Sequence, residues 1–124
     1  MAYVQKEVPR YFGDTEISTL NNVRDAILDN FPREELYAEG LSVDHRSPNP
    51  HLQGKIWCGR EELFMSYSFR YCPSGMVVTL QQRSGELIQD QLGGLVEKLA
   101  GIIEKASEAS SRRIAERLRE PALR

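Results

Sequence analysis

The sequence is poor in the residues on which the most recognisable catalytic sites depend. Its 124 residues include two cysteines, Cys58 and Cys72, and two histidines, His45 and His51. The cysteines form neither a CxxC pair nor the dense framework of a small secreted domain, so we expect free thiols. The histidines are the only side chains whose ordinary pKa suits proton transfer near neutral pH. We interpret both as polar surface residues.

Several sequence motifs are also absent. There is no GxSxG turn around a nucleophilic serine, no GxxxxGK[ST] phosphate loop and no GxGxxG after a strand. The two histidines and two cysteines are ligand types for tetrahedral zinc, but five, six and thirteen residues separate them, whereas structural zinc sites bring ligands in close pairs. We therefore expect a protein that is not an enzyme and that uses no metal and no cofactor.

Long apolar runs are missing too. No stretch approaches the roughly 18 uninterrupted apolar residues that span a bilayer. The first seven residues, MAYVQKE, lack the basic segment and the apolar run of a secretory signal. We expect a cytoplasmic protein that does not contact a membrane.

The charge is nearly balanced overall but unevenly distributed. Sixteen Lys and Arg against eighteen Asp and Glu give a net charge of -2 and a pI near 5.7, so no basic excess points to nucleic acid. The segment 14–44 holds eight acidic and two basic residues, a balance of -6. The segment 105–124 holds six basic and three acidic residues, a balance of +3. These segments can attract each other within one chain or between two chains.

The length fits one domain, because single cores usually close at about 100 to 150 residues. Residues 1–13 have no sustained periodicity and are expected to form an N-terminal arm. A helical pattern then begins at Asp14 and ends before Pro32, with apolar residues at three- and four-residue steps. We expect a single α+β domain over 14–120, opening with this amphipathic helix, and a C-terminal tail over 121–124.

The middle of the chain predicts a three- to four-stranded antiparallel sheet. The expected strands are residues 41–45, 55–58, 62–71 and 76–83. The segment 47–51 contains two prolines and is expected to be an exposed loop. One face of the third strand carries Leu63, Met65, Tyr67, Phe69 and Tyr71. This face is the expected core, so its aromatic residues are poor candidates for stacking on nucleic-acid bases.

A long C-terminal helix is expected from Ser84 to Glu120, where Pro121 stops it. Gly93 and Gly94 interrupt its pattern, and each costs roughly 1 kcal/mol relative to alanine. Either the helix is continuous and its small residues admit a second backbone, or two helices meet at a kink. The continuous helix predicts a homodimer interface of Leu92, Gly93, Leu95, Leu99, Ala100 and Ile102.

The absence of catalytic patterns beside extensive apolar helical surface predicts a non-catalytic, homodimeric binding protein. It would occupy a surface on a macromolecular partner, as an inhibitor, an adaptor or a chaperone does. A protein partner is expected at the proline-containing loop and its neighbours, because loops on a rigid sheet carry many binding contacts. The residues predicted to bind the partner are His45, Arg46, Asn49, His51, Gln53 and Arg60.

The arginine-rich end of the last helix is the alternative binding surface. Its residues are Arg112, Arg113, Arg117 and Arg119. They suit a small nucleic-acid-binding regulator or an acidic protein partner through salt-sensitive attraction. A sequestering protein for a small anionic ligand and an enzyme with unfamiliar residues are the remaining alternatives.

Overall fold

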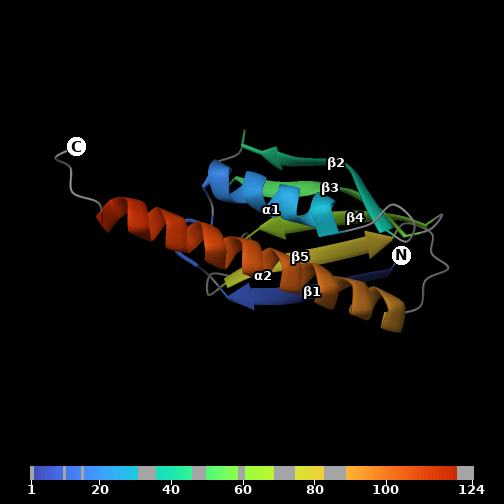
Figure 1. The fold of residues 1–124 in the computed structure, drawn as a ribbon. Coiled ribbons are helices and arrows are strands. Elements are labelled where there is room, and N and C mark those ends of the chain that lie inside the picture. The colour runs from blue at the N-terminus through green and yellow to red at the C-terminus, as the bar shows by residue number, and fades with distance from the viewer. Residues whose placement is uncertain are drawn as a thin grey trace.

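The computed structural model folds the chain into a five-stranded antiparallel sheet with two helices on one face (Figure 1). It describes residues 2–9, 11–14, 16–30, 36–45, 50–58, 61–68, 75–82 and 89–119. In chain order the elements are β1 (Ala2–Pro9), α1 (Ile17–Asn30), β2 (Leu36–Asp44), β3 (His51–Cys58), β4 (Glu61–Ser68), β5 (Gly75–Gln82) and α2 (Gln89–Arg119). The α+β class, the antiparallel sheet and the long C-terminal helix agree with the sequence prediction.

The strands lie in the order β1-β5-β4-β3-β2, and every neighbouring pair is antiparallel. The predicted count of three or four strands is therefore too low. The prediction of an irregular arm over residues 1–13 is wrong for Ala2–Pro9, which pairs with β5 throughout. Lys6 makes this strand difficult to recognise in the sequence. It lies on the helix side of β1 between Val4 and Val8, so it interrupts the alternation of apolar residues that predicts a strand. Its Nζ lies 2.7 Å from Oε2 of Glu97 on α2.

The other outer strand, β2, also differs from the prediction. It begins at Leu36 rather than Leu41, and its register with β3 shifts between Glu39 and Ser42. Such a shift marks a β-bulge or a similar irregularity, which breaks the regular alternation of side chains. Sequence alternation therefore revealed only the second half of this strand.

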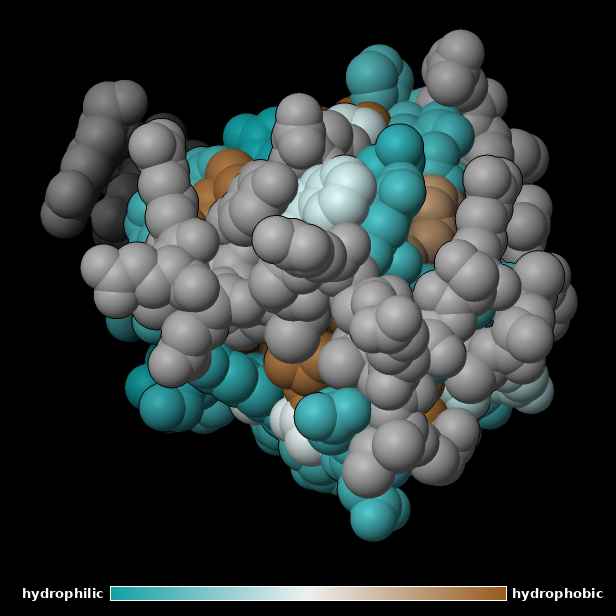
Figure 2. Space-filling view, turned by 90° about the vertical axis from the view of Figure 1, so that its right-hand side faces the viewer, coloured by the Kyte–Doolittle hydropathy of each residue, from teal (hydrophilic) through white to brown (hydrophobic). Residues whose placement is uncertain are grey.

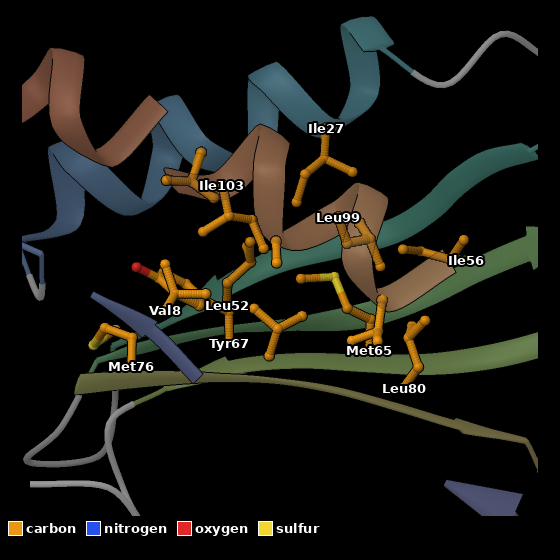
Figure 3. Packing of buried hydrophobic residues seen from close by; sticks show 14 of the residues in the cluster. Val8, Ile27, Leu52, Ile56, Met65, Tyr67, Met76, Leu80, Leu99 and Ile103 are labelled. Atoms are coloured by element: carbon orange, nitrogen blue, oxygen red, sulfur yellow. The ribbon is translucent and has the colours of Figure 1, made fainter. Parts of the chain in front are cut away.

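Alternate residues of each strand face the helices and form the core (Figure 3). Met65 and Tyr67 of β4 are buried, as their alternation predicted. Ile27 of α1 and Leu99 and Ile103 of α2 pack against the sheet residues of the same cluster. Burying each such side chain contributes roughly 1.5 to 3 kcal/mol, so this core holds both helices on one face. The matching predictions for Phe69 and Tyr71 lie outside the described residues.

α2 is one continuous helix through Gly93 and Gly94, which excludes the kinked alternative. Packing explains why the glycines are tolerated, because Leu92 and Leu99 on either side are completely buried. The predicted end at residue 120 is close to the observed last helical residue, Arg119.

The apolar stripe of α2 lies inside the molecule. Leu92, Leu99 and Ala100 are buried, and Leu95 and Ile102 pack against the same core. The chain's own sheet and α1 cover this stripe, so these residues do not offer the predicted homodimer interface. The periodicity identified the buried face of the helix correctly but could not say what covers it.

A short turn connects β1 to α1. Gly13 has a φ of 83°, a conformation that residues with a Cβ rarely adopt. The Oδ2 of Asp14 accepts a hydrogen bond of 2.6 Å from the backbone N–H of Tyr11. The turn thereby directs α1 back over the sheet, antiparallel to α2 (Figure 1).

Candidate binding surfaces

One end of the sheet carries His45 and His51, two of the residues predicted to bind a partner. Pro9, Asp44, His51, Ser68 and Gly75 mark this end, because β1, β2 and β4 finish there while β3 and β5 begin there. The N-terminus of α1 and the C-terminus of α2 lie at the same end (Figure 1). We call it the loop end. The described residues that flank the predicted loop, Asp44 and His51, and the arginine-rich end of α2 are thus at the same end of the molecule.

The predicted loop residues do not all come together. His45 is exposed at the loop end, whereas His51 and Gln53 are half-buried strand residues of β3 rather than loop residues. The His51 Nε2 and Gln53 Oε1 atoms lie 3.2 Å apart. Arg46, Asn49 and Arg60 lie outside the described residues. The residues on either side of position 60, Cys58 and Glu61, are at the opposite end of the sheet.

The C-terminal turns of α2 reach beyond the strands (Figure 1). The helix has 31 residues and is about 46 Å long, whereas an eight-residue strand spans about 27 Å. We call Arg112–Arg119 the α2 overhang. This length difference is the signal in the sequence that could have revealed it.

The core-facing stripe of α2 continues onto the overhang without a covering surface. Ile103, Ser107 and Ser110 are buried, and Ile114 is half-buried beside Gly13. One turn later Leu118 is 70% exposed. Each residue follows the previous one by three or four positions, so all lie on one side of the helix. Leu118 therefore extends an apolar stripe past the body of the domain.

The loop end also exposes charged side chains and a second large apolar side chain. Arg113, Arg117 and Arg119 are exposed, and Arg112 Nη2 forms a 2.6 Å ion pair with Glu108 Oε1. The two residues are four positions apart, the spacing at which oppositely charged side chains on a helix are neighbours. The turn between β1 and α1 adds Phe12, which is 61% exposed. Acidic groups are also present here, because Glu16 and Glu116 are exposed.

The opposite end of the molecule has a different surface. Figure 2 looks onto it, and the hydrophobic residues drawn in colour form small separate patches in this view. The exposed Phe12 and Leu118 make the loop end a candidate for binding a macromolecule.

A buried polar seam joins α2 to the sheet and to α1. Tyr67 Oη lies 3.2 Å from Ser107 Oγ, and Asn22 Nδ2 donates to Ser110 Oγ at 3.0 Å. Burial raises the pKa of the Tyr67 hydroxyl, although its bond to Ser107 acts in the opposite direction. Nearer the surface, Tyr11 Oη donates to Glu104 Oε1 at 2.9 Å, and this bond raises the pKa of Tyr11.

The seam satisfies polar groups within the core rather than forming a reaction site. Ser107 and Tyr67 are both completely buried, so a substrate cannot reach their hydroxyls. Sequence reasoning missed the seam because two serines on an otherwise apolar stripe look like interruptions of the core. The spacing of Ser107 and Ser110 from Ile103 placed them on the buried side.

The face of the sheet away from the helices forms a second candidate surface, which we call the open face. Its side chains alternate with the core residues on all five strands. One row across it contains an uncharged hydrogen-bonding residue from every strand. This amide–hydroxyl row consists of Gln5, Thr79, Ser66, Gln53 and Ser42, in register.

A neighbouring row on the open face carries aromatic residues. Tyr3, Gln81, Phe64 and Lys55 are in register across four strands, and we call them the aromatic row. Phe64 is 46% exposed on β4, the central strand. Sequence reasoning missed both rows, because a row combines residues from separate strands and becomes visible only with the register.

Charge on the open face is either paired or near its margins. Lys55 Nζ and Glu62 Oε1 form a 2.8 Å ion pair between β3 and β4. Glu7 and Asp44 lie on the two outer strands, β1 and β2. The middle of the face is therefore mainly uncharged.

The described residues contain no group of three or more His, Cys, Asp or Glu side chains arranged to hold a metal ion. Neither α1 nor α2 is long and apolar enough to cross a membrane. Comparison with known protein families, with curated proteins and with solved structures finds no match to this chain.

Proposed function

We propose that this protein is a non-catalytic binding protein whose loop end docks on an acidic surface of a partner protein. The observation that carries the proposal is Leu118, which is 70% exposed on a stripe that is otherwise buried or half-buried. Arg113, Arg117 and Arg119 are exposed on the same overhang. An exposed apolar side chain among arginines has the composition of a binding hot spot, because arginine and large apolar groups carry much of the energy of protein interfaces.

A protein partner fits the loop end better than nucleic acid does. Phosphate groups would gain from Arg113 and Arg117 but would meet Glu16 and Glu116 on the same end. An apolar side chain such as Leu118 gains little against a phosphate backbone, whereas a protein surface can bury it. Attraction between the arginines and acidic residues of the partner would then weaken as salt is added.

The test combines capture with a measured affinity. A protein retained from native lysate by the immobilised chain would be purified, and its binding measured by calorimetry. The double variant Arg113→Glu with Arg117→Glu should weaken that binding at least tenfold, as should Leu118→Ala. The matched control, Lys98→Glu with Lys105→Glu, makes the same charge change on exposed positions in the body of α2 and should leave the affinity unchanged.

Two results would reject the proposal. If both charge reversals weaken binding equally, long-range charge rather than the overhang is responsible. If nuclease treatment of the lysate abolishes capture and the purified chain binds nucleic acid with a steep salt dependence, the nucleic-acid alternative replaces the protein partner.

A further inference from the structure

The open face approaches the size of one side of a standard protein interface. Five strands about 4.8 Å apart and about 27 Å long give a footprint of roughly 600 Å². Protruding side chains make the accessible area larger than the footprint. A stable interface of standard size buries about 800 Å² on each partner, so this single face approaches what one interface requires.

The distribution of residues on this face follows that of an interface. Phe64 projects from the central strand and is 46% exposed, and the amide–hydroxyl row beside it is uncharged. Glu7 and Asp44 lie on the outermost strands. Protein interfaces also have aromatic groups and little net charge in the middle, and here the two charged residues near Phe64, Lys55 and Glu62, are paired with each other. The exposed surface of α2, by contrast, carries many charged residues, including Glu97, Lys98 and Lys105.

The hydrogen-bonding groups of the open face are complementary to the same groups on a second copy. Gln, Ser and Thr side chains each donate and accept hydrogen bonds, so a row of them can pair with the same row of another molecule. The ion pair of Lys55 and Glu62 leaves no charge of one sign near the middle to repel a copy. In a twofold-symmetric dimer the same patch is used by both subunits and must be self-complementary in this way.

From this size, residue distribution and self-complementarity, we propose that the open face binds the open face of a second copy of this chain, with Phe64 in the middle of the interface. The dimer interface thus lies on the side of the sheet opposite the α2 stripe that the sequence indicated. The inference is independent of the proposed function, because it uses different residues on a different surface.

Light scattering coupled to gel filtration, with the full chain at about 1 to 100 μM, tests the inference. The wild type should reach twice the chain mass of 14.1 kDa. Phe64→Glu should raise the dimer dissociation constant by about 30-fold or more, as expected for a hot-spot residue. Leu28→Glu is the matched control, because Leu28 is 43% exposed on α1, on the other side of the sheet, and this variant should keep the wild-type dissociation constant.

A second substitution guards against a folding defect in Phe64→Glu. Thr79→Glu places a charge on the amide–hydroxyl row of β5 and should also weaken the dimer, while circular dichroism confirms that each variant is folded. A wild type that stays monomeric at 100 μM overturns the inference. A dimer that persists unchanged in both folded open-face variants, or that is lost in Leu28→Glu, overturns it as well.

Discussion

Replacing Gly94 and Gly101 of α2 with alanine should stabilise the protein. Both residues are exposed, and a Cβ at either position would meet no atom within 4 Å. Glycine inside a helix costs about 1 kcal/mol relative to alanine, because it loses more backbone freedom on folding. The two sites are seven residues apart, about 10 Å along the axis, so their effects should add to about 2 kcal/mol.

Urea unfolding followed by circular dichroism at 222 nm measures this change at one fixed protein concentration. The unfolding midpoint should rise with an unchanged slope, which indicates a change in stability alone. In thermal unfolding, each alanine should raise Tm by about 4 °C for a chain of this length. A lower midpoint would refute the reasoning, because it would mean that another backbone approaches the helix at these glycines.

Two further predictions concern the turn and the buried seam. Gly13→Ala should destabilise the fold by about 1 to 2 kcal/mol in the same urea assay, because alanine is strained at a φ of 83° and its Cβ would lie 2.6 Å from Ile114 Cδ1; an unchanged midpoint would contradict this. Tyr67 should make the protein less stable above about pH 10, because the unfolded tyrosine ionises near 10.0 whereas burial keeps the folded one protonated. Tyr67→Phe should flatten that alkaline decline, measured as the free energy of unfolding between pH 8 and 11, and a decline as steep as in the wild type would assign it to other groups.

The sequence was informative wherever one side of an element was continuously apolar. The alternation in β4 identified Met65 and Tyr67 as core residues, and the three- and four-residue steps in α1 identified Leu20 and Ile27. These patterns arise because burial on one face imposes the period of the backbone on the sequence. β1 escaped detection because Lys6 occupies an inward position, where its charge pairs with Glu97, a residue 91 positions away.

The candidate surfaces were less accessible to sequence reasoning. The prolines before His51 correctly marked a break between strands, but His51 and Gln53 already alternate with buried Leu52 as strand residues do. The stripe around Leu99 looked available to a second chain. Periodicity shows which face of a helix is buried, but it does not show which part of the protein covers that face. The amide–hydroxyl row depends on strand register, which no single segment of the sequence contains.

The two outer strands have a consequence for how far assembly can proceed. An exposed strand edge is a template for adding another strand, and repeated addition leads to fibres. β1 carries Lys6 on its inward side and ends at Pro9, and β2 has an irregular register between Glu39 and Ser42. Inward charges, proline and bulges are devices that discourage edge-to-edge addition. Pairing through the open face would bury that face in a closed pair, so the proposed dimer would not lead to open-ended growth.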